Sequence, residues 1–320
     1  MAFRVILFSV LVILILPSSG TTLVHITHEY ANVDAQSAIG LPMGSEKTII
    51  DQVGNLRWSQ WSIRRREPEV PFGISRQMDG ALDLRLAVAS PSGPLAPFKA
   101  VKQELYRGRF PFVETRLEAP PGLAAEELAF PTAIEGAGLD VVRITVTNRG
   151  SDGTTVEAHF SGKMRNNPAF AEGNILATRD ARLVVLGEAE GCEWGPEKGG
   201  LILKCRTLVP PNSSCVIWLK RPHDMRVSHK SVLLGLAGST LLEQAERSWQ
   251  EFWEQGLKVE LPEKEVIDFL YSSLACLFIL TEYDAQGDLW TLDGPTVYRH
   301  FWPRSEYYMG LGMEMSGHHD

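Results

Sequence analysis

The sequence predicts a large antiparallel β-sandwich followed by a helical region. Residues 142–147 and 156–161 each alternate apolar and polar side chains, and a Gly- and Asn-containing turn separates them. The same pattern occurs at residues 201–206 and 215–220, on either side of a Pro-Pro-Asn-Ser turn. Alternation with period two is typical of half-buried strands. Near residue 235 the apolar period becomes that of a helix, which marks the change of architecture.

Each of these two strand pairs is predicted to form a hairpin, because a short Gly/Asn/Pro turn joins two alternating segments. Shorter strand candidates lie at residues 22–28, 82–88, 113–118 and 183–186. We therefore expect residues 21–235 to form the β-sandwich domain. Trp58 and Trp61 are three residues apart, and at least one of them is expected in the core of the sandwich.

Residues 236–256 are predicted to form a linker helix. Thr240 and Glu243 fit a capping box at its start, and Gly256 is a typical end. One helical face is uniformly apolar and consists of Leu241, Ala245, Trp249, Phe252 and Trp253.

Residues 257–320 contain two more helices, at about 266–280 after Pro262 and at about 305–316. The first is apolar on nearly all sides, and such a helix is usually buried on several faces. We expect residues 257–320 to be the incomplete start of a larger helical domain in a truncated chain. The alternative is that these helices pack across one end of the sandwich.

The composition restricts the class of protein. The 320 residues are 44% hydrophobic and 22% charged, with a net charge of −8, and the longest run of like charge is 64–66. A nucleic-acid-binding protein would present a basic face, so we expect no nucleic-acid partner. Residues 1–20 match a secretory signal, with Arg4, a twelve-residue apolar run and small residues before the cleavage point. The mature protein is therefore predicted to be secreted, with no membrane contact after cleavage; its oligomeric state is left open.

Export makes disulfides possible among the four cysteines. Cys192, Cys205 and Cys215 are close in sequence, and both Cys192–Cys205 and Cys205–Cys215 are candidate pairs. Cys276 lies in the apolar helical run and is expected to be a buried free thiol. The sequence has no CxxC pair and no Walker, GxSxG or HExxH motif, so no metal and no cofactor is predicted.

A polar loop leads from the second helix into residues 298–309, which read YRHFWPRSEYYM. Aromatic rings suit the apolar faces of sugars, and an Arg fork suits their hydroxyls. The order of sandwich, Trp-bearing linker helix, Pro-led helix and aromatic-Trp-x-Arg segment resembles the six-hairpin glycosidases. This superfamily includes bacterial glucoamylases, maltose-type phosphorylases and rhamnosidases.

The resemblance implies an N-terminal antiparallel supersandwich followed by the first helices of an (α/α)6 toroid. It also implies a carbohydrate substrate, with Tyr298, Phe301, Trp302, Arg304 and Glu306 as the substrate-binding residues. Where the family places Asp after the Arg, this chain has Ser305, so Glu306 is the nearest acid. For Asp293 a structural role is expected.

The resemblance further implies a glycoside hydrolase acting on an oligo- or polysaccharide by inversion. In these families the two catalytic carboxylates come from later hairpins, which places them beyond Asp320. No catalytic residue is therefore named, and the chain alone is expected to be inactive. Glu282 and Asp284 are assigned turn-forming rather than catalytic roles. The alternative is a complete, non-catalytic, secreted carbohydrate-binding or surface β-sandwich protein.

Overall fold

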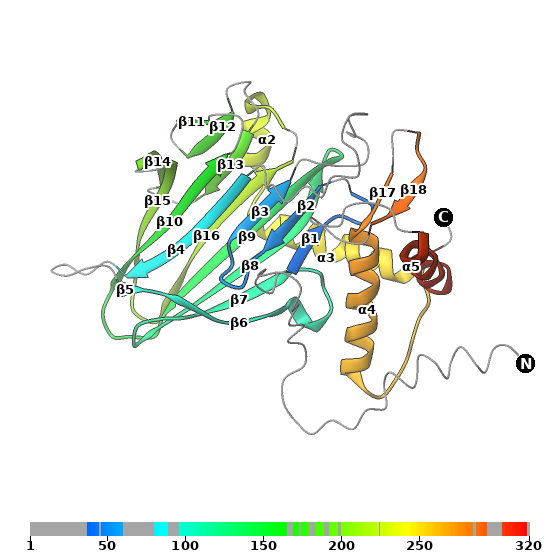
Figure 1. Cartoon of the computed structure of the whole chain (residues 1–320). Helices are drawn as coiled ribbons and strands as arrows, with labels where there is room; N and C mark the ends of the chain where they lie inside the picture. The colour runs from blue at the N-terminus through cyan, green and yellow to red at the C-terminus, as the bar shows by residue number, and fades with distance from the viewer. Residues whose placement is uncertain are drawn as a thin grey trace, which may run out of the picture. The chain divides into compact units, whose positions relative to one another are not determined.

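Figure 1 shows a computed structural model that describes residues 37–44, 46–59, 80–88, 96–164, 169–172, 174–178, 183–188, 192–197, 200–223, 225–283, 286–292 and 303–318. The chain divides into two compact units, Met1–Ala35 and Gln36–Asp320, and everything described below belongs to the second. The predicted signal at residues 1–20, the strand expected at 22–28, and Trp61 lie outside the described residues.

The described residues are mainly β structure, in two large antiparallel sheets (Figure 1). The first sheet contains β1 (Ser37–Gly40), β2 (Lys47–Ile50), β3 (Leu56–Ser59), β4 (Gly80–Val88), β10 (Thr154–Met164), β15 (Gly200–Val209) and β14 (Cys192–Glu197) in that order, with β5 (Ala96–Pro97) beside β4. The second sheet runs in the order β11 (Ala169–Glu172), β12 (Ile175–Thr178), β13 (Leu183–Glu188), β16 (Ser213–Pro222), β9 (Ala137–Asn148), β8 (Leu123–Ile134), β7 (Val113–Glu118) and β6 (Lys99–Leu105). The predicted β-sandwich is therefore present.

The two predicted hairpins are wrong, although their strands exist. β9 pairs with β8 and β16 in the second sheet, whereas β10 pairs with β4 and β15 in the first. The turn between β9 and β10 therefore carries the chain from one sheet to the other. The Asn148 side chain holds this crossing, because it donates to the carbonyl oxygens of Asp152 at 2.7 Å and Val209 at 3.0 Å. The turn between β15 and β16 crosses between the sheets in the same way.

The main core lies between the sheets and follows the period-two pattern. Val156, Ala158 and Phe160 of β10 are buried against Val142 and Ile144 of β9 in one apolar cluster. Trp58 also enters this cluster and is 3% exposed, as the sequence predicts. Strands with one buried face alternate in this manner because successive side chains point to opposite sides of a sheet.

Part of the second sheet, around β8, is buried on both faces. Leu128 and Phe130 of β8 point away from the main core and join a second cluster with Trp249 and Trp253. These tryptophans belong to α3 (Gly238–Gln255), the predicted linker helix. Its five predicted apolar residues are all buried, so the helical face is confirmed. The capping box is wrong, because α3 starts two residues before Thr240 with no side-chain cap.

Two further helices follow the linker. α4 (Lys264–Ile279) packs beside β1, and α5 (Pro303–Met315) packs beside α4 and β18 (Figure 1). Between them lies a small hairpin of β17 (Thr281–Tyr283) and β18 (Leu289–Thr291). The sequence did not reveal η3 (Val227–His229) and α2 (Lys230–Gly235), which precede α3. Within the described residues, none of these helices has the length and apolar composition that a membrane crossing requires.

The cysteines resolve one of the open alternatives. Cys192 of β14 lies opposite Cys205 of β15 in the antiparallel register, and the two form a disulfide. Cys215 and Cys276 are free thiols. Cys276 lies on the exposed side of α4 and is not buried as the sequence predicted, because the apolar residues of α4 bury only one flank of the helix.

Candidate functional site

The sugar-binding residues expected from the sequence fall at the edge of the described structure. Tyr298, Phe301, Trp302 and Asp293 lie outside the described residues. Arg304 and Glu306 belong to the first turn of α5, which begins at Pro303 as its sequence favours, but their side chains are not described. Asp284 also lies outside the described residues. The roles given to these residues remain predictions.

The two stems of this predicted sugar-binding loop are well anchored. On the incoming side, the Leu292 amide donates to the Leu280 carbonyl at 3.0 Å. The hydroxyls of Thr281 and Thr291 lie 3.2 Å apart and both contact the sulfur of Met313 in α5. Because Met313 is on the outgoing helix, these buried contacts hold the beginning and the end of the loop together.

Glu282 has a different role from the one that the sequence suggested. It is in strand β17, not in a turn, and its side chain is fully buried. Its carboxylate lies 3.2 Å from the Lys47 ammonium of β2, which is equally buried. A buried ion pair needs good geometry to offset the cost of removing both charges from water. This pair therefore fixes the β17–β18 hairpin to the edge of the first sheet.

A larger polar cluster joins β2, β9 and the end of β16. Asp140 accepts hydrogen bonds from Arg221 at 2.8 Å and Thr48 at 2.5 Å, and His223 lies 3.1 Å from it. Burial alone would raise the pKa of Asp140, but Arg221 and His223 outweigh it and hold this pKa well below its ordinary value. The side chains of Asp140, Arg221 and His223 are at most 8% exposed, so a saccharide cannot reach them. The cluster therefore has a structural role: it connects β2, β9 and the end of β16.

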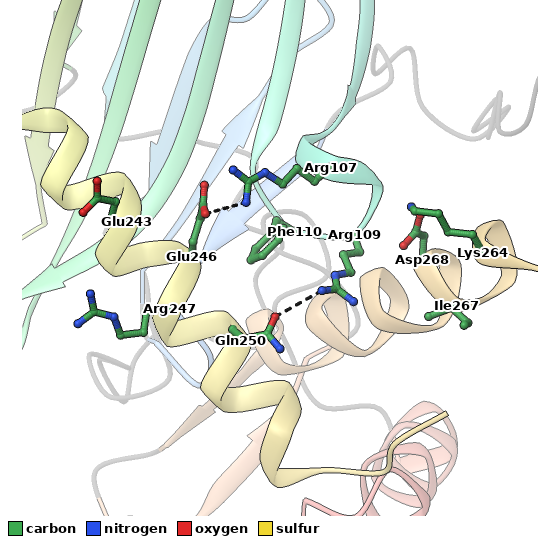
Figure 2. Close-up of a pocket in the computed structure, with 10 residues that line it drawn as sticks. All are labelled: Arg107, Arg109, Phe110, Glu243, Glu246, Arg247, Gln250, Lys264, Ile267 and Asp268. Carbon is green, nitrogen blue, oxygen red and sulfur yellow. Dashed lines mark hydrogen bonds and ion pairs between the residues drawn. The ribbon is translucent and has the colours of Figure 1, made fainter. Parts of the chain in front are cut away.

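The described surface contains a cavity of about 720 Å³ between the turn η2 (Tyr106–Gly108), α3 and the first turn of α4 (Figure 2). Arg107 and Gly108 both have left-handed backbone angles, with φ of 51° and 82°. The positive φ favours glycine at position 108, and a Cβ there would also lie 2.7 Å from an Asp268 carboxylate oxygen. This turn directs Arg107 and Arg109 toward α3 and α4.

Charged side chains line much of the cavity, and these charges are partly paired (Figure 2). Arg107 forms an ion pair with Glu246 of α3 at 2.8 Å, and Lys264 pairs with Asp268 on α4. Burial, together with a hydrogen bond to Glu246, raises the pKa of the neighbouring Tyr106 hydroxyl. A cavity of this size is typical of small-ligand sites. Sequence reasoning missed it because the η2 wall is more than 130 residues away from the walls formed by α3 and α4, as the Arg109–Gln250 contact across 141 positions shows.

Comparisons with known proteins give a weak likeness. No protein-family model matches the chain, and no curated protein matches it. A putative kojibiose phosphorylase from human microbiome is 7% identical, with a TM-score of 0.42, over 76% of this chain and 39% of that one. A bacterial glucoamylase complexed with acarbose is 8% identical, with a TM-score of 0.48, over 78% and 42%.

A third solved structure, the Slr1438 protein from Synechocystis sp. PCC 6803, is 11% identical with a TM-score of 0.37. That match covers 63% of this chain and 99% of the Slr1438 chain. The match to the first two structures spans about two fifths of their length, 39% and 42%. Their names are those of carbohydrate-active enzymes.

Proposed function

We propose that this chain is the N-terminal part of a secreted glycoside hydrolase that cleaves an oligo- or polysaccharide with inversion. The sandwich would support a helical toroid, and the catalytic acid and base would lie on helices downstream of Asp320. Inversion requires two carboxylates about 6.5–9.5 Å apart, with room for a water molecule between one of them and the sugar.

The observation that best supports this proposal is the difference in burial between α3 and the helices that follow it. α3 is firmly seated on the second sheet, but the helices that follow it leave large apolar side chains in solvent. Phe269 of α4 is 57% exposed, and Tyr307 and Tyr308 of α5 are 67% and 62% exposed. Exposed apolar groups on this scale mark a surface that another element covers. Further helices of the same toroid are the cover that the sequence resemblance implies.

The substrate pocket would be built in part by Tyr298, Phe301, Trp302, Arg304 and Glu306. The anchored loop stems support this assignment, since a binding loop must be held in place by a rigid base. Arg304 at the start of α5 would bind sugar hydroxyls. Glu306 would take the place of the Asp that the resembling families have after the Arg.

Secretion is part of the proposal. The described disulfide between Cys192 and Cys205 supports it, because such bonds persist in oxidising compartments and are rare in the cytosol. The apolar run at residues 5–16, preceded by Arg4, supplies the export signal.

The test uses the native secreted protein, purified from its source and incubated with a panel of neutral and acidic oligosaccharides. Proton NMR during the first minutes is expected to show release of a product whose anomeric configuration is opposite to that of the substrate. Arg304→Ala is expected to raise KM or lower kcat at least tenfold with an unchanged melting temperature. The control Arg206→Ala, on the exposed edge of β15, is expected to change neither.

Two results would contradict the proposal. Saccharide binding without any release of reducing sugar would favour a non-catalytic binding protein. A product with the anomeric configuration of the substrate would exclude inversion.

A further inference from the structure

The Arg109 side chain is the unusual feature of the cavity between η2, α3 and α4 (Figure 2). Its guanidinium carbon lies 5.8 Å from the ring centre of Phe110, 5.3 Å from that of Trp253 and 5.6 Å from that of Tyr271. Its hydrogen bond within the described residues is a long one, 3.4 Å, to the neutral side-chain amide of Gln250. The aromatic rings, and not a carboxylate, therefore hold this charge.

This arrangement leaves the guanidinium able to bind an anion. A guanidinium carries five N–H donors in its plane, and aromatic rings on its faces do not occupy them. The planar fork matches a carboxylate or another oxyanion with two parallel hydrogen bonds. The other cations near the turn have their own acids, since Arg107 pairs with Glu246 and Lys264 with Asp268.

The electrostatic field of the cavity favours the same ligand. Its lining contains four cations and three carboxylates, which gives a net charge of +1. The first turn of α4 also lines it and supplies Lys264, one of the four cations.

The wall formed by α3 indicates what else the ligand carries. Glu243, Glu246, Arg247 and Gln250 occupy one face of this helix, at spacings of three, four and seven residues. Glu246 and Gln250 point toward Arg107 and Arg109 (Figure 2), and Glu243 and Arg247 complete the hydrogen-bonding groups of this wall. A set of this kind suits several hydroxyl groups. The volume of about 720 Å³ accommodates one or two sugar rings.

The left-handed Arg107 supports a binding role for the turn. Its φ is 51°, and non-glycine residues with positive φ occur often at ligand-binding sites. Both Arg107 and Arg109 of this turn line the cavity.

We propose that the cavity between η2, α3 and α4 binds a hydroxylated carboxylate, namely a uronate residue of an acidic saccharide, with Arg109 as the carboxylate-binding residue. The site goes beyond the proposed function and does not depend on it, because it is tested by binding alone.

The test is isothermal titration calorimetry on the full chain with glucuronate, galacturonate, glucose, inorganic phosphate and sulfate. One of the two uronates is expected to bind at least tenfold more tightly than glucose, which has the same ring without the carboxylate. Arg109→Gln is expected to weaken uronate binding at least tenfold. The matched control Arg206→Ala, on β15 and away from the cavity, is expected to change it less than twofold.

Arg109 also packs against Trp253 and Tyr271, so its replacement can affect folding. Hydrogen exchange on the unaltered chain provides a second readout. Uronate is expected to slow amide exchange at residues 106–110 and 243–250 and not at residues 201–209. Equal affinity for glucose and the uronates, or unchanged exchange at residues 106–110, would overturn the site. Phosphate or sulfate binding as tightly as the uronates would overturn the assignment to an acidic sugar. A failure to detect glycoside hydrolysis by the native protein would count against the proposed function and not against the uronate site.

Discussion

The second sheet and the helices α4 and α5 all carry large apolar side chains, but these side chains have very different surroundings. Leu128 and Phe130 of β8 are fully buried, because the first sheet covers one face of their strand and α3 the other. Phe269 of α4 and Tyr308 of α5 are mostly exposed. The difference shows that an apolar pattern identifies a surface that needs a partner, whereas only the structure shows whether the partner is present.

The buried charged side chains also differ in whether they have partners. Lys47 forms an ion pair with Glu282, and Asp140 forms one with Arg221. Glu127 of β8 is an exception. Both of its carboxylate oxygens are buried with no hydrogen-bond partner among the described residues, and burial together with nearby Asp51 raises its pKa well above the ordinary value.

The largest effect is expected from a substitution that disrupts the contact between α3 and the second sheet. Trp249→Ala removes a side chain that is 1% exposed in the second cluster, and it is expected to lower the free energy of unfolding by about 4 kcal/mol. Denaturant unfolding followed by circular dichroism measures this. Leu208→Ala, at a 63% exposed position on β15, is the control and is expected to change stability by less than about 0.5 kcal/mol. Equal effects would refute the role assigned to α3.

The next effect concerns the joint between β2 and β17. Glu282→Leu leaves the Lys47 ammonium buried without this carboxylate and is expected to cost about 3 kcal/mol. The double variant Lys47→Met/Glu282→Leu removes both charges and is expected to recover most of that loss. A double-mutant cycle on the free energies of unfolding measures the coupling. Strictly additive losses would show that the two residues act independently.

A smaller effect with the opposite sign is expected at Glu127. The raised pKa in the folded state means that the carboxyl stabilises the fold fully only below its unfolded pKa of about 4.3. The contribution is lost as the pH rises toward the folded-state pKa. Glu127→Met is therefore expected to stabilise the protein at pH 7 by about 1–2 kcal/mol and to flatten its stability between pH 5 and 8. Glu118→Met, at an exposed position of β7, should do neither.

The smallest effect on stability is expected at Phe269, an exposed side chain of α4. Phe269→Ala is expected to change the stability of this chain by less than about 0.5 kcal/mol, because the side chain is mostly in solvent. The same variant is expected to bind less of a hydrophobic dye. A loss of 2 kcal/mol or more would mean that Phe269 is already packed, and that α4 needs no further partner.

The sequence predicted which segments are strands and helices better than it predicted how they pair. β7 was placed at the residues that the structure gives it, and α3 and α5 to within about two residues, because the period of the apolar residues is a local signal. The two hairpins failed because a Gly/Asn/Pro turn serves equally well within a sheet and between two sheets. Pairing is decided by distant strands such as β4 and β16, which no local pattern reveals.

The candidate sites show the same difference between local and long-range information. The predicted sugar-binding residues came from one short segment, 298–306, and their roles remain predictions. The cavity near Arg109 was missed because its walls come from three separate parts of the chain. The buried partners of Lys47 and Asp140 were missed for the same reason, since a charged residue in a sequence does not show whether its partner lies 80 or 230 positions away.

The most direct test of the account is hydroxyl-radical footprinting of Phe269, Tyr307 and Tyr308 in the native protein from its source and in recombinant residues 21–320. If these residues begin a larger helical domain, oxidation of the three side chains is expected to fall at least fivefold in the native protein, while that of exposed Val101 on β6 stays the same. Equal oxidation of all three in both samples would contradict the proposal that further helices cover α4 and α5.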